Sequence, residues 1–66
     1  MKNTLKVHRA THDITQGELA EAIGVSRQTV NSIESGKYVP STVLSLKIAR
    51  HFKVSLHEIF ELDPDD

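Results

Sequence analysis

The side chains best suited to recognition chemistry lie close together between positions 27 and 32. Four of them project from one side of the segment if it is helical: Arg27, Gln28, Asn31 and Ser32. An arginine carries a fork of donors and an amide pairs a donor with an acceptor, which are the groups that match base edges in a DNA major groove. A simpler interpretation stays open, because the solvent-facing side of any helix is polar.

The segments around these residues predict two short helices joined by a sharp turn. Thr15 followed by Glu18 is a capping box, so a helix begins there. Gly24 stands where a left-handed residue commonly ends a helix, and Ser26 can cap the next helix, which Gly36 terminates. Two helices joined by about three residues have the short linkage of a helix-turn-helix.

This stretch, residues 15–36, resembles the helix-turn-helix of the Cro/C1-type family of phage repressors, also called XRE-like, with the typical sequence TQ-x-ELA-x-x-x-GVS-x-x-x-x-x-x-E-x-G-K. The small and apolar positions carry the resemblance: Leu19, Ala20, Ile23, Gly24, Val25, Val30 and Ile33. The resemblance covers nearly the whole chain. It implies an all-α, five-helix, lambda-repressor-like DNA-binding domain that regulates transcription, as a repressor that binds a pseudo-palindromic operator as a homodimer.

The resemblance also implies roles for individual residues. The expected contacts to bases come from the four polar residues at positions 27 to 32. The expected contacts to DNA phosphates come from Thr15, Gln16, Ser26, Lys37, Tyr38 and Ser41. Arg9 is expected to reach Glu34 and to form a structural ion pair that fixes the first helix against the third.

Helix signals also occur on both sides of the central stretch. With Asn3 or Thr4 as its cap, the first segment predicts a helix to about Thr11. Ser41 can cap a further helix over residues 42–52, whose apolar positions spread round most of the helix and predict burial on more than one side.

The carboxy-terminal segment predicts a short fifth helix and then an extended end. Ser55 with Glu58 is a second capping box. Residues 60–62 alternate apolar and polar before a proline, which favours a brief strand paired with residues near Met1.

Apolar residues are also more numerous near this end than a small core requires, so residues 54–63 are expected to face a second subunit. The residues expected at the dimer interface are Leu56, Ile59, Phe60 and Leu62.

Composition bounds the function further. The net charge is −1, but residues 1–57 carry +4 and residues 58–66 carry −5. If the acidic end points away from the DNA, a positive surface meets the phosphates; a solvated tail without such a role is the alternative. The chain has no cysteine and no long apolar run, which argues against disulfides, a thiolate metal site and a membrane span, and favours a reducing, cytoplasmic setting. Sixty-six residues fit one domain.

Other functional classes find little support. His8 and His12 lie four residues apart, but no acidic third ligand has a defined spacing beside them, so no metal is expected. No phosphate loop, nucleophile elbow or carboxylate pair indicates an enzyme, a cofactor or a small-molecule ligand. The serious alternative is a protein-interaction or antitoxin-type module built on the same fold.

Overall fold

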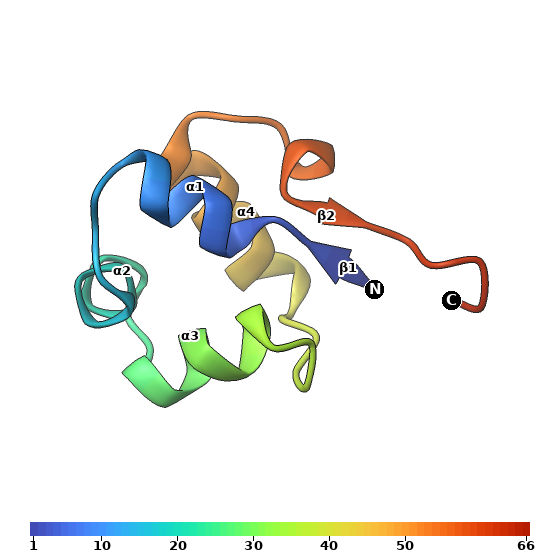
Figure 1. Cartoon of the computed structure of the whole chain (residues 1–66), viewed down its shortest axis with the longest axis horizontal. Helices are drawn as coiled ribbons and strands as arrows, with labels where there is room; N and C mark the ends of the chain where they lie inside the picture. The colour runs from blue at the N-terminus through green and yellow to red at the C-terminus, as the bar shows by residue number, and fades with distance from the viewer.

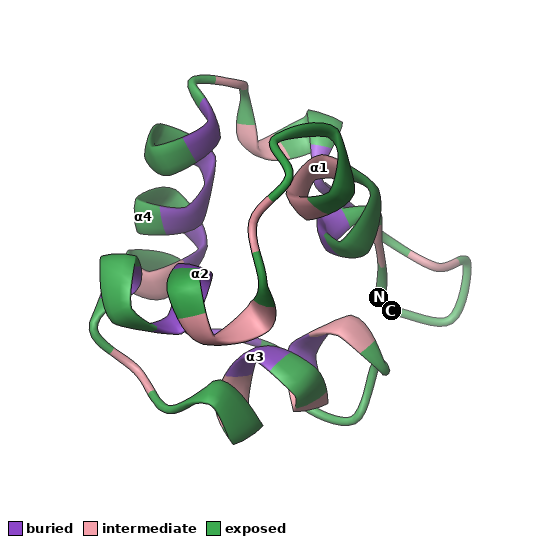
Figure 2. Cartoon of the chain, turned by 60° about the vertical axis from the view of Figure 1, so that its left-hand side comes forward, coloured by how far each residue is buried: buried purple, intermediate pink, exposed green.

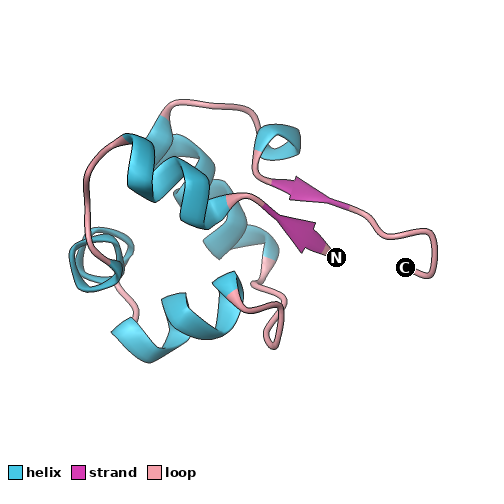
Figure 3. Cartoon of the chain, viewed as in Figure 1, coloured by secondary structure: helices cyan, strands magenta, loops and turns pink.

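The structure, a computed structural model, describes residues 1–66 and contains four α-helices, one 3₁₀ helix and a two-stranded sheet (Figures 1 and 3). The elements follow one another as β1 (Lys2–Asn3), α1 (Leu5–Thr11), α2 (Gln16–Ile23), α3 (Arg27–Glu34), α4 (Thr42–Phe52), η1 (Leu56–Glu58) and β2 (Phe60–Glu61). The fold is mostly helical, as predicted. No helix has both the length and the hydrophobicity to cross a membrane.

Of the five predicted helices four are confirmed as α-helices, and the fifth is present only as a single 3₁₀ turn. The amide of Glu58 bonds to the carbonyl of Ser55, and that of Ile59 to the carbonyl of Leu56, both at three-residue spacing. Glu58 caps the turn, since its carboxylate accepts the Ser55 N–H at 2.6 Å. The chain must then extend at once into β2, so no second turn can form.

Thr4 is the N-cap residue of the first helix, but its side chain makes no cap bond, and Asn3 supplies a bond to the first turn instead. The Oδ1 of Asn3 accepts the N–H of Leu5 at 3.2 Å, while its Nδ2 donates to the carbonyl of Ile33 at 2.9 Å. The hydroxyl of Thr4 instead donates to the carbonyl of Glu58. Asn3 therefore ties the start of α1 to the end of α3.

The two ends of the chain pair with each other, as predicted. Strands β1 and β2 are antiparallel, with Lys2 opposite Glu61 and Asn3 opposite Phe60. Figure 1 shows this sheet beside the helices, with both termini on the same side of the molecule.

One apolar core holds the four α-helices together. Figure 2 shows that the buried residues of the helices face the interior. The core residues are Leu5, Leu19, Ala20, Ile23, Val30, Ile33, Ile48, Ala49, Phe52, Ile59 and Phe60.

The prediction that α4 is buried on more than one side is wrong. Val43 and Leu46 on α4 keep 65% and 53% of their surface exposed, whereas Ile48 is fully buried. The other α-helices cover one face of α4, and a chain of this length supplies no further element for the other face.

The predicted surplus of apolar residues near the carboxy terminus is also smaller than expected. Ile59 and Phe60 are 1% and 7% exposed and belong to the core, so this protomer leaves neither free for a partner. Leu56 is half-buried against the same core, and only Leu62 is largely exposed. The sheet causes the difference, because it folds the chain end back over the helices.

Candidate nucleic-acid interface

The helix-turn-helix begins at the predicted capping box. The hydroxyl of Thr15 accepts the N–H of Glu18 at 3.0 Å, and the carboxylate of Glu18 accepts the N–H of Thr15 at 2.8 Å. The carboxylate also suits the positive end of the helix dipole. These reciprocal bonds fix the orientation of α2 at its first turn.

The turn between α2 and α3 depends on one glycine. Gly24 has φ +76°, in the left-handed region that residues with a side chain rarely adopt. The next helix starts two residues later, where the hydroxyl of Ser26 accepts the N–H of Thr29 at 3.1 Å. The turn therefore brings α3 against α2 with only Gly24, Val25 and Ser26 between the two helices.

Helix α3 has one buried and one exposed side. Val30 and Ile33 are fully buried, whereas Arg27, Gln28 and Asn31 are exposed. The three exposed side chains line one shallow hollow together with Gln16 from the start of α2. Forked donors and amides thus converge on one surface, which is the arrangement needed to read base edges.

Ser32 lies apart from that hollow. It is half-buried and lines a neighbouring depression together with Gln28 and Tyr38. Its backbone carbonyl accepts the N–H groups of Lys37 and Tyr38 at 3.0 and 3.2 Å. Ser32 therefore positions the loop that follows α3, in addition to its place beside the polar face.

An ion pair joins α1 to α3. The Nε of Arg9 lies 2.8 Å from Oε2 of Glu34, and its Nη2 lies 3.3 Å from Oε1. The third donor of Arg9, Nη1, reaches the carbonyl of Ile14 at 3.0 Å. The two side chains are 17% and 6% exposed, and hydrogen bonding to Glu34 raises the pKa of Arg9 above its ordinary value. The guanidinium therefore stays charged.

Gln16 belongs to the same network, which sequence reasoning missed. Its Nε2 donates to Oε1 of Glu34 at 3.1 Å. An amide nitrogen carries two hydrogens, so the second remains available to a phosphate. No sequence signal joins Gln16 to Glu34, because they lie 18 positions apart on different helices.

The residues expected at phosphates lie at the starts of α2, α3 and α4 and in the loop between α3 and α4. Thr15 and Ser26 are exposed at helix starts, where their hydroxyls already serve as caps. Lys37 and Tyr38 are exposed in the loop, and the hydroxyl of Ser41 accepts the N–H of Leu44 at the start of α4.

Three of the four histidines lie next to Phe52, an aromatic ring of the core. The rings of His8, His12 and His51 have their centroids 5.8, 5.0 and 5.0 Å from that of Phe52. The Nδ1 atoms of His8 and His12 each lie near a backbone carbonyl four residues back, at 3.0 and 2.9 Å. No group of three or more His, Cys, Asp or Glu residues is arranged to hold a metal ion.

A capped pair of helices at a tight turn, with forked donors on the exposed side of the second helix, defines a helix-turn-helix DNA-binding domain. Comparison with known proteins agrees with this class. A family model described as helix-turn-helix matches residues 5–59, and the chain belongs to this family of transcriptional regulators. The resemblance seen in the sequence is thereby confirmed.

Two relatives of equal length share this assignment, and a longer antitoxin matches over part of its length. An uncharacterized HTH-type transcriptional regulator of Methanocaldococcus jannaschii is 52% identical over 66 residues, which is all of both chains. The HTH-type regulator YgzD of Bacillus subtilis is 44% identical, again over all of both chains. The antitoxin PezA of Streptococcus pneumoniae is 40% identical over 55 residues, which is 83% of this chain and 35% of PezA.

Proposed function

We propose that this protein is a sequence-specific transcriptional repressor that binds a pseudo-palindromic operator as a homodimer. One observation carries the proposal: the exposed side of α3 presents Arg27, Gln28 and Asn31 around a shallow hollow. A surface for docking a protein would instead have an apolar or aromatic centre.

In this mechanism α3 enters the major groove and its polar side chains select the sequence. Arg27 and Gln28, at the start of the helix, read guanine or adenine edges, and Asn31 contributes one turn further on. Ser32 makes a further base or phosphate contact beside Tyr38.

Contacts to the DNA backbone set the register of α3. Thr15 and the second N–H of Gln16 hold one phosphate at the start of α2, where the exposed N–H groups of the first turn also point. The DNA backbone on the other side of the groove is bound by four residues: Ser26, Lys37, Tyr38 and Ser41. A dimer fixed in this way represses transcription by occupying the site that polymerase needs.

Selection of bound duplexes from a random pool tests the proposal directly. We expect a palindromic site with two half-sites separated by about 34 Å, one turn of the double helix. No enrichment of any sequence would contradict the proposal. That outcome would favour an antitoxin-type interaction module, for which the identity with PezA is the specific observation.

Two substitutions separate base reading from phosphate binding. Arg27→Ala should lose about 1 to 3 kcal/mol of discrimination at particular base pairs. Lys37→Ala should weaken binding to all sequences similarly and reduce the slope of log K against log salt by about 0.9. Lys6→Ala, which removes an exposed lysine of α1, is the matched control. Equal effects of Arg27→Ala on selected and random DNA would contradict the base-reading role.

A further inference from the structure

The outward side of α4 carries apolar and basic side chains in one row. Val43 and Leu46 keep 65% and 53% of their surface exposed, and Lys47 and Arg50 are exposed as well. The four residues recur at helical spacing, so they share one face of α4, and together they line one depression. We call this set of four residues the α4 outer face. Its first half is apolar and its second half is positively charged.

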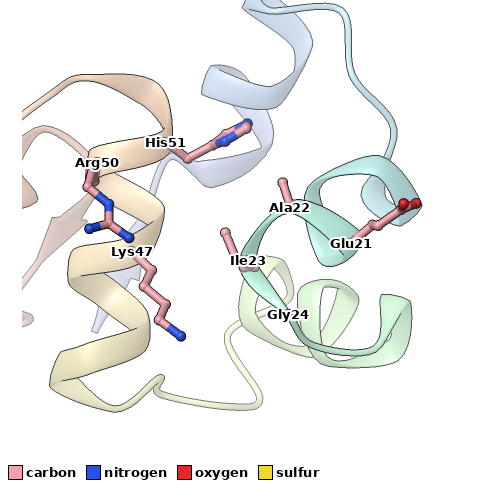
Figure 4. Close-up of a pocket in the computed structure, with 7 residues that line it drawn as sticks. All are labelled: Glu21, Ala22, Ile23, Gly24, Lys47, Arg50 and His51. Carbon is pink, nitrogen blue, oxygen red and sulfur yellow. The ribbon is translucent and has the colours of Figure 1, made fainter.

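The charge of the α4 outer face has no counter-charge within the chain. Lys47 and Arg50 take part in none of the ion pairs of the structure, whose basic partners all lie within residues 1–9. Residues 35–57 contain four lysines and arginines but no aspartate or glutamate. Glu21 on α2 lines the adjoining groove, but Figure 4 shows its carboxylate pointing away from both cations. The two cations are therefore available to carboxylates of another molecule.

We infer that the α4 outer face binds an acidic segment of another protein. Aliphatic side chains of that segment contact Val43 and Leu46, while its carboxylates meet Lys47 and Arg50. Surfaces that bind each other carry complementary charge, so two unpaired cations select an acidic partner. An apolar centre with charged residues at its border is also the usual composition of a protein-binding surface. The inference goes beyond the proposed function, because this contact requires no DNA.

DNA phosphates fit the α4 outer face less well than protein carboxylates do. Helix α4 begins after Ser41, which is expected at the DNA backbone, and Lys47 and Arg50 lie roughly 9 and 14 Å farther along the helix axis. Figure 2 shows the exposed side of α4 at the left and that of α3 at the bottom, so the two sides face different directions. The DNA backbone is bound mainly through charge, which would leave Val43 and Leu46 without a partner. The α4 outer face therefore lies outside the expected DNA contacts.

An unbiased peptide selection tests the chemistry of the partner. Random short peptides displayed on phage are selected on the full chain, and a parallel selection uses the Arg50→Glu variant. We expect the wild-type chain to enrich peptides in which aspartate or glutamate lies next to leucine, isoleucine, valine or phenylalanine, and the variant to lose them. Enrichment of neutral or basic peptides, of the same acidic peptides by both chains, or of no peptide at all would overturn the inference.

Charge reversal then locates the contact, with a selected peptide as the probe in fluorescence anisotropy. Lys47→Glu and Arg50→Glu should each raise the Kd of the peptide at least about tenfold, because like charges would then face each other. Lys6→Glu is the matched control, since Lys6 is an exposed, unpaired lysine of α1, and it should change the Kd less than about threefold through long-range charge alone. An equal rise of the Kd in Lys6→Glu would show a response to net charge, and would overturn the inference.

The apolar half of the face has its own matched pair of variants. Val43→Ser should raise the Kd about fivefold or more because a buried aliphatic contact is lost, whereas Val7→Ser, at a valine of α1 that is 61% exposed, should leave it unchanged. Chemical shifts of the wild-type chain locate the peptide without any substitution. We expect the largest changes at residues 43–50, and the largest changes on α3 would overturn the inference.

DNA binding provides the last outcome and separates this inference from the proposed function. Lys47→Ala and Arg50→Ala should bind random duplexes as the wild-type chain does. A loss of affinity and of salt dependence equal to that of Lys37→Ala would assign both residues to the DNA contacts and overturn the inference. A chain that binds acidic peptides through the α4 outer face but selects no DNA sequence would contradict only the repressor proposal.

Discussion

At the scale of single residues, Glu34 connects three helices through its carboxylate. It accepts hydrogen bonds from Arg9 on α1 and from Gln16 on α2, while it ends α3. A carboxylate that is 6% exposed needs such partners, because burial penalises its charged form. The same network that holds the first helix in place therefore also orients Gln16 for its expected phosphate.

Removing Arg9 should be costly. In Arg9→Met the carboxylate of Glu34 keeps only Gln16, and we expect a loss of about 3 kcal/mol in the free energy of unfolding, measured by urea denaturation. The estimate lies at the lower end of the range for buried pairs, because Arg9 is 17% exposed. The control is Lys2→Met, which removes exposed pairs with Asp63 at 3.8 Å and Glu61 at 4.0 Å and should cost less than about 1 kcal/mol. Equal losses in both variants would show that the buried pair has no special role.

At the scale of elements, each helix start is fixed by a side chain a few residues away. Thr15, Ser26 and Ser41 each accept the N–H three residues further on, as the sequence predicted. The helices differ more in how they end, and the turn before α3 requires the left-handed conformation of Gly24. The direction of α3 therefore depends on the absence of a side chain at that one position.

Two glycines of α2 and its turn should respond oppositely to alanine. Gly24→Ala should destabilise the domain by about 1 kcal/mol, because φ is +76° although no atom lies within 4 Å of the added Cβ. Gly17→Ala should stabilise it by less than about 1 kcal/mol, since the residue is helical and the new Cβ meets only the hydroxyl of Thr15 at 3.8 Å. Thermal unfolding followed by circular dichroism measures both. Destabilisation by Gly17→Ala would show that its backbone needs glycine for another reason.

At the scale of the whole molecule, the ends of the chain are held together by charge as well as by the sheet. The ammonium of Met1 lies 2.9 Å from Asp63 and 3.0 Å from Asp66. Hydrogen bonds to Asp63 and then Asp66 raise the pKa of this ammonium. The backbone N–H of Asp63, followed by the ammonium, lowers the pKa of Asp66. Two of the five acids of residues 58–66, Asp63 and Asp66, are therefore held against the amino terminus.

These two shifts give the terminal pairing an upper and a lower pH limit. The ammonium has a raised pKa, so its contribution is full below the unfolded value and is lost as pH rises through the folded value. Asp66 has a lowered pKa, so its contribution is present above the unfolded value and is lost as pH falls through the folded value. We expect the amide signal of Lys2 in NMR spectra to report both transitions.

Substitution tests whether the acids that contact the Met1 ammonium, and not the neighbouring Asp65, raise the pKa of that ammonium. Asp66→Asn should lower the pKa of the Met1 ammonium toward its ordinary value, with Asp63 still bound. Asp65→Asn is the matched control, because Asp65 makes no bond to the ammonium. An equal fall in the pKa in both variants would point to general acidity of the tail instead of the observed pair.

The sequence alone determined the features that depend on neighbours within four positions. The capping boxes, the glycine turn and the polar side of α3 follow from local hydrogen bonds and helical spacing. The Arg9 to Glu34 pair was expected only through family resemblance, since 25 positions separate its members.

Tertiary structure alone decided which apolar residues are buried in the core of the protomer. Ile59 and Phe60 are buried because β2 pairs with β1, and Val43 and Leu46 are exposed because no element covers that side of α4. The spacing of apolar residues indicates which face of a helix should be buried, but the residues that bury it come from segments distant in the chain. The link from Gln16 to Glu34 has the same origin, because only packing brings the start of α2 to the end of α3.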